Sequence, residues 1–135
     1  TIHGDLNLEN VLVGPGGFVW LIDFAMTREG HTLFDFAHLG AELVAHLAAP
    51  QMAAPAEYLA FLQAVFSDDV HDSPLLPLFR ALRQVAGNCL FNPLQPREYH
   101  LALALACLGA LKFNNLDAHQ KHLLYLTAAY LGQAM

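Results

Sequence analysis

Apolar residues recur at three- and four-residue spacing along most of the chain after residue 35, which is typical of helices that bury one face. Proline, glycine and polar clusters interrupt this pattern and divide it into five segments. Segment 97–113 is apolar on nearly all sides, so we expect it at the centre of a helical bundle. The predicted helices cover residues 35–47, 56–66, 76–90, 97–113 and 117–131.

The beginning of the chain has a different pattern. Two short apolar runs, 11–13 and 18–22, flank a turn of sequence Gly-Pro-Gly-Gly, and this predicts a β-hairpin. Trp20 lies on the second predicted strand, and we expect it to pack in the core. No strand–helix alternation follows the hairpin. The predicted fold class is therefore α+β and mainly helical, with one β-hairpin followed by about five helices.

Polar residues gather at the open end of the predicted hairpin. Asn10 opens the first strand and Asp23 closes the second, so pairing of the strands brings these two side chains close together. Asp5 precedes the first strand at the same edge. Carboxylate and amide oxygens are the hard ligands that Mg²⁺ prefers. This arrangement suits phosphoryl transfer, in which Asn10 and Asp23 hold the metal and Asp5 accepts the proton of the attacking hydroxyl.

The motifs in this region also resemble those of a known superfamily. They are His3-Gly4-Asp5, then Asn10, the hairpin, Ile22-Asp23-Phe24 and Asp35-Phe36-Ala37. Together they resemble the C-terminal lobe of the protein-kinase-like superfamily, and its aminoglycoside phosphotransferase and choline kinase branch in particular. The resemblance implies a kinase-like fold with Asp5 as catalytic base and with Asn10 and Asp23 as magnesium ligands. His3 and Asp35 would support the site, and the cofactors would be Mg²⁺ with ATP or GTP.

A second resemblance is to the kinase-like "ternary complex associated" domains of large bacterial multidomain proteins. It rests on the run from Trp20 to Ala25 and on the run from Glu29 to Ala37. The chain also departs from the kinase pattern, because Asn7 stands where protein kinases have a lysine. No cation in the loop is therefore ready to meet the transferred phosphate.

The parts that hold a nucleotide in kinases are not found in the sequence. Gly14-Pro-Gly-Gly lacks the spacing and the lysine of a phosphate-binding loop. No strand lysine pairs with a helix glutamate. We expect residues 1–135 to form a single domain, a kinase-like C-terminal lobe excised from a larger protein. The nucleotide-binding N-terminal lobe would come from the rest of that protein, and the isolated chain would be inactive.

The loop after Asp23 supplies further candidates. Arg28 is the only cation near the site, and we expect it to contact phosphate or an acidic neighbour. Glu29 and His31 lie in the same loop, where a contact with substrate and a plain loop role are both open. Asp35 begins the first predicted helix, and its carboxylate could act as the N-cap.

Composition narrows the function classes. Six Lys and Arg stand against twelve Asp and Glu, which disfavours nucleic acid as a partner. The longest apolar run, 101–111, is too short to span a bilayer, and no signal peptide opens the chain, so we expect a cytoplasmic protein that does not contact membranes. Only 13% of residues are charged and 56% are apolar, so we expect part of the surface to contact a partner that lies outside this chain.

Two functions follow from these observations. The first is a magnesium-dependent phosphotransferase lobe that transfers the γ-phosphate of ATP or GTP to a hydroxyl of a small molecule. The alternative is a catalytically weak or inactive kinase-like interaction module of a larger bacterial multidomain protein. The intact motifs favour the first, whereas the loop departures and the low surface charge favour the second.

Overall fold

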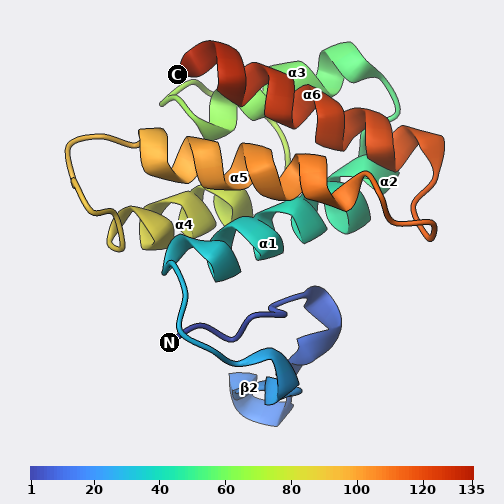
Figure 1. Ribbon diagram of the computed structural model, residues 1–135. Coiled ribbons are helices and arrows are strands. Elements are labelled where there is room, and N and C mark those ends of the chain that lie inside the picture. Colours follow the sequence, from blue (N-terminus) through green and yellow to red (C-terminus); the bar gives the residue numbers. More distant parts are fainter.

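The computed structural model describes residues 1–135 and shows a two-stranded hairpin followed by five helices (Figure 1). Strand β1 (Val11–Val13) pairs antiparallel with β2 (Val19–Leu21), and Leu12 lies opposite Trp20. In the connecting turn Gly16 and Gly17 have positive φ values of 75° and 78°, which glycine adopts without steric cost. The predicted fold class, mainly helical α+β, is confirmed.

The first helix is longer than predicted. It consists of α1 (Leu33–Leu43), a π-helical turn (Val44–Ala48) and α2 (Ala49–Gln51). We expected Pro50 to end the helix near residue 47, and this was wrong. Pro50 lacks the N–H that would bond to the preceding turn, yet the helix continues through it to Gln51. The wider π turn just before it accommodates the change.

The other helices begin where the sequence pattern places them. They are α3 (Pro55–Val65), α4 (Leu76–Gly87), α5 (Arg97–Ala110) and α6 (Ala118–Ala134). Asp117 caps α6 through a reciprocal pair of hydrogen bonds with Gln120, because the two N–H groups would otherwise lack partners. None of these helices is long and apolar enough to cross a membrane.

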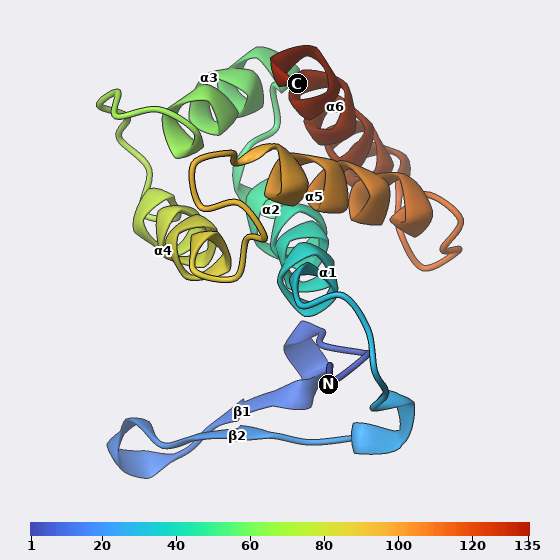
Figure 2. The same cartoon turned by 60° about the vertical axis from the view of Figure 1, so that its left-hand side comes forward.

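The main hydrophobic core lies among the helices. Its buried cluster begins at Leu33 and includes Tyr58, Phe61 and Leu123, each fully enclosed. Figure 2 shows the hairpin projecting away from this helical body. The prediction that Trp20 packs in the core is therefore wrong: its side chain is 51% exposed, because no second layer covers the two-stranded sheet.

Helix α5 packs against both α1 and α6 but is not enclosed. Leu101, Leu105 and Leu108 are exposed on its outer side. As expected, α5 lies between other helices, but the expectation that it is enclosed on all sides is wrong. An all-round apolar sequence leaves the orientation of the helix undetermined, and here one apolar side faces outward.

A buried hydrogen bond between α3 and α6 gives a test of this core. The Thr127 hydroxyl donates to the Leu123 carbonyl at 2.8 Å, so the Tyr58 phenol donates to Thr127 Oγ1 at 2.6 Å. Thr127→Val leaves that enclosed phenol without a partner, and we expect about 1–3 kcal/mol lower free energy of unfolding in urea. Tyr58→Phe removes the stranded donor and should cost about 1 kcal/mol. Equal losses in the two variants would contradict this account.

Candidate functional site

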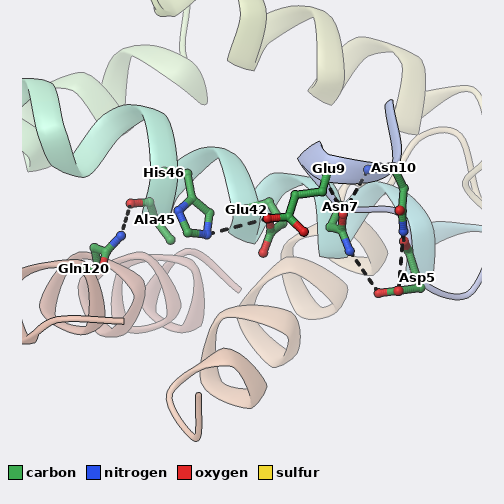
Figure 3. Close-up of polar contacts among 8 residues, drawn as sticks. All are labelled: Asp5, Asn7, Glu9, Asn10, Glu42, Ala45, His46 and Gln120. Carbon is green, nitrogen blue, oxygen red and sulfur yellow. Dashed lines mark hydrogen bonds and ion pairs between the residues drawn. The ribbon is translucent and has the colours of Figure 1, made fainter. Parts of the chain in front are cut away.

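Two asparagine side chains hold Asp5 in the loop that precedes β1. Asn7 Nδ2 donates to Asp5 Oδ1 at 3.2 Å, and Asn10 Nδ2 donates to Asp5 Oδ2 at 3.4 Å and to the Asp5 carbonyl at 2.8 Å (Figure 3). Asp5 is half-buried, whereas Asn10 is buried. Both carboxylate oxygens therefore have a fixed direction, as a group that accepts a proton from a bound hydroxyl requires.

His3 connects this loop to the end of β2. Its Nδ1 accepts the N–H of Asp5 at 3.3 Å, so Nε2 carries the proton and donates to the Ile22 carbonyl at 2.8 Å. The imidazole is buried, and its ring centre lies 4.9 Å from that of Phe24. His3 thus fixes Asp5 relative to the residue just before Asp23. This is a positioning role, because neither ring nitrogen is free.

Asp35 holds the other side of the same loop. Its carboxylate accepts the backbone N–H of His3 at 2.7 Å and that of Gly4 at 2.9 Å. The N-cap interpretation of Asp35 is wrong: α1 begins at Leu33, and Asp35 points from its first turn toward the loop. Instead, the ring Nδ1 of His31 accepts the Leu33 N–H at 3.2 Å at the start of the helix.

Gly4 is required where the loop approaches residues 26–28. Its φ is +85°, and a Cβ placed there would collide with the Met26 carbonyl and with the Arg28 guanidinium. Ile2 also forms a backbone bridge with Arg28 beside it. The His-Gly-Asp motif therefore has a steric reason for its glycine as well as two polar neighbours that point into the site.

The hairpin register brings the two predicted metal ligands to the same edge. The Ile22 N–H donates to the Asn10 carbonyl at 3.0 Å, which places Asp23 one residue beyond this pair. Asp23 is exposed and adopts a left-handed backbone conformation (φ 58°), a region that Asp tolerates better than most residues. Its carboxylate forms no hydrogen bond or ion pair within the chain, and the Asn10 side chain donates only through Nδ2, which leaves Oδ1 free.

These donors fit a magnesium ion of the kind that nucleotide-dependent enzymes use. Mg²⁺ is commonly bound through one or two protein oxygens, with water and phosphate oxygens completing its octahedron. One carboxylate and one amide oxygen meet that description. No group of three or more His, Cys, Asp and Glu residues in the chain forms a metal cluster, so a site closed by protein ligands alone is not the arrangement found.

The remaining candidates have partners within the chain. Arg28 Nη1 donates to the Met26 carbonyl at 2.9 Å, and the guanidinium lies over the Phe34 ring at 5.0 Å. It forms no ion pair, so the expected contact with an acidic neighbour is absent, while a contact with phosphate stays a prediction. Glu29 accepts the Thr1 hydroxyl at 2.8 Å, and this bond lowers the pKa of its carboxyl. His31 serves the start of α1, as described above.

The role of Asn7 was not predicted from the sequence, where Asn7 was noted only as standing in place of a lysine. Besides holding Asp5, the Asn7 Oδ1 accepts the N–H groups of Glu9 at 3.0 Å and Asn10 at 3.1 Å, capping the 3₁₀ turn Leu8–Asn10. An asparagine directly before such a turn, where its side chain can accept the N–H groups two and three residues further on, is a recognisable capping signal. That signal could have predicted this contact.

Comparison with known families adds one decisive match. The model of the family described as ternary complex associated domain 9 (TCAD9) matches residues 1–112. The chain belongs to the TCAD9 family. The matched region contains the loop, the hairpin and helices α1 to α5. No curated protein and no solved structure matches the chain, so the kinase-like resemblance stays a prediction.

The attachment of the TCAD9 loop to α1 can be tested at Asp35. Asp35→Asn replaces one of the two accepting oxygens by an N–H₂ donor that faces a backbone donor. We expect a loss of about 2 kcal/mol in unfolding free energy, since hydrogen bonds to a charged acceptor contribute about 1.5–3 kcal/mol. Amide hydrogen exchange at His3 and Gly4 should accelerate as well. Asp72→Asn, in an exposed loop, is the control, and equal effects of both substitutions would refute the attachment.

Proposed function

We propose that this TCAD9 domain is a kinase-like interaction module of a larger bacterial protein assembly, which docks through its hairpin. The observation that carries the proposal is the exposure of the hairpin on both faces. Val13 is 70% and Phe18 is 69% exposed, and residues 10–22 contain no charged side chain. We call the exposed apolar residues of this region the hairpin surface: Leu12, Val13, Phe18, Val19, Trp20, Leu21, Ile22, Phe24 and Met26.

An isolated two-stranded hairpin is at best marginally stable in water, and a large contiguous apolar patch usually marks an interaction site. All three residues of β2 are exposed, so a partner can cover side chains on both faces of the strand. The family description, which refers to a ternary complex, agrees with a role in assembly. The low content of charged residues, 13%, has the same explanation, because interface cores are depleted of charge.

Magnesium and a nucleotide would bind at the base of this hairpin. We propose that Asn10 Oδ1 and Asp23 hold Mg²⁺ with ATP or GTP, and that the nucleotide-binding lobe belongs to the rest of the parent protein. Bound Mg²⁺ would neutralise part of the negative charge of the phosphates. Because Asp23 directly follows the hairpin, occupancy of the site and docking of the hairpin surface would influence each other. The net charge of −6 makes nucleic acid an unsuitable partner, and the proposed location is the cytoplasm.

Site-specific photo-crosslinking tests the docking. A benzophenone side chain replaces Trp20 in the parent protein, expressed in its own host, and Leu78 on α4 is replaced in the same way as the control. Leu78 is 44% exposed and lies outside the hairpin surface. We expect position 20, and not position 78, to crosslink to a second polypeptide. Crosslinks confined to the parent protein would instead mean that its own chain covers the hairpin.

A second candidate function is phosphoryl transfer to a hydroxyl of a small molecule. The observation that favours it is the pair of asparagine amides that direct both oxygens of Asp5, because a general base must be oriented toward the proton that it accepts. In this case Asp5 accepts the proton of the attacking hydroxyl while the metal neutralises the developing phosphate charge. Arg28, Glu29 and His31 would lie on the side where substrate or phosphate enters.

Turnover by the parent protein separates the two candidates. If the protein is a phosphotransferase, Asp5→Asn should retain binding of magnesium nucleotide and lose about 10²-fold or more in turnover, as loss of a general base does. Asp23→Asn should also weaken binding of the metal-nucleotide complex. Magnesium-dependent binding without turnover in the wild type, over several classes of hydroxyl acceptor, would leave the interaction module as the function.

A further inference from the structure

A second apolar feature lies along the first helix. A groove of about 630 Å³ runs between α1 and α5, and its lining extends from His31 and Phe34 at one end to Phe113 and Leu116 at the other. The two helices contact each other and cross at an angle, since in Figure 2 α1 points nearly along the line of sight and α5 runs across the view. At a rise of about 1.5 Å per residue, the part of α1 that lines the groove is about 16 Å long.

The walls of the groove are regular. Two sets of alanines at four-residue spacing line it: Ala37, Ala41 and Ala45 on α1 and the π turn that follows it, and Ala102, Ala106 and Ala110 on α5. Residues four apart form the rows that interdigitate when helices pack. Two rows of small side chains facing one groove leave room for the larger row of a third helix. A compact ligand would leave much of this length unfilled.

Exposed leucines extend the apolar surface beyond the groove. Leu101 and Leu105 line it and Leu108 continues the row along α5, with Leu105 59% exposed. The spacing of these residues, i, i+4 and i+7, matches the apolar face of a helix that packs along its length. An occupant that covers all three must therefore be extended and parallel to α5, as a helix is and a small molecule is not.

The titratable groups along the groove indicate which charge its occupant should carry. The Glu42 side chain lines the groove, is only 21% exposed, and forms no hydrogen bond. Its single ionic neighbour is His46 Nε2 at 3.8 Å. The other titratable groups along the groove are His31, His38 and Lys112, and the Lys112 ammonium lies 5.6 Å from the centre of the Phe113 ring at the far end. A basic side chain beside Glu42 would supply the partner that this carboxylate lacks.

We propose that the α1–α5 groove binds an amphipathic, basic α-helix of a partner protein. About three turns of such a helix match the length of the groove, with large apolar residues at i, i+4 and i+7 and a Lys or Arg opposite Glu42. The proposal rests on the function proposed above, since it names a second docking surface of the same module. The net charge of −6 favours the same partner, because opposite charge assists association and selects against acidic helices.

Fluorescence anisotropy with defined peptides tests the proposal on the 1–135 chain. The probe is a labelled Leu/Lys peptide of about four turns with leucines at helical spacing; a scrambled peptide of the same composition and a Leu/Glu peptide are its controls. Leu105→Glu should weaken binding of the Leu/Lys helix at least about tenfold, and its matched control Leu78→Glu should have no effect. Glu42→Gln should weaken binding about threefold, as expected for a partly exposed ion pair, while Glu57→Gln on α3 should not.

Several outcomes would overturn the proposal. These are equal binding of the scrambled peptide, tighter binding of the Leu/Glu peptide, and equal effects of Leu105→Glu and Leu78→Glu. Binding of monomeric decyltrimethylammonium at the groove without binding of any helix would make it a small-molecule site. Conversion of a dimer to a monomer by Leu105→Glu would show that a second copy occupies it.

The experiments distinguish failure of the helix-binding groove from failure of docking through the hairpin surface. Trp20→Lys alters the hairpin surface and should leave peptide binding unchanged. Groove binding without any crosslink at position 20 would remove the function proposed for the hairpin but keep the helix site. A crosslink at position 20 without groove binding would do the reverse. Circular dichroism and thermal unfolding of Leu105→Glu check that the exposed substitution leaves the fold intact.

Discussion

The Asp35 carboxylate accepts the N–H groups of His3 and Gly4, and through these two bonds the first turn of α1 holds the loop that carries Asp5. The loop itself contributes little to the hydrophobic core, whose buried cluster begins at Leu33, although Leu8 packs against it. Its position therefore depends on polar contacts. His3 connects the loop to the end of β2, and Asn10 connects it to the start of β1. The relative positions of Asp5, Asn10 and Asp23 therefore depend on this one anchored loop.

Both apolar surfaces are attached to α1. The hairpin surface is attached through the loop that Asp35 holds, and the α1–α5 groove is lined in part by α1 itself. Asp35 and part of the groove lining belong to α1, which packs against α4 and α5. The hairpin surface lies beyond the anchored loop, and the α1–α5 groove lies along the helix. A chain with so few charged residues can stay folded with two such surfaces because its core among the five helices is complete without them. Both surfaces then remain for contacts with other molecules.

Much of this structure could be predicted from the sequence, for physical reasons that differ from element to element. Helical periodicity and prolines located the starts of α3 to α6, and the hairpin register correctly placed Asn10 beside the end of β2. Periodicity identifies an apolar face but cannot tell whether another element covers it. For that reason Trp20 and the outer leucines of α5 were expected to be buried and are exposed. The Asn7 cap has a recognisable sequence signal, whereas the π turn before Pro50 depends on local backbone geometry that composition does not encode.

Hydrogen exchange measured by mass spectrometry tests the central claim, that this TCAD9 domain is an interaction module, most directly. The measurement compares residues 11–26 in the isolated chain and in the parent protein within its native assembly. We predict fast exchange in the isolated chain, where the hairpin is open to water on both faces, and strong protection in the assembly. Equally fast exchange of residues 11–26 in both samples would contradict the account.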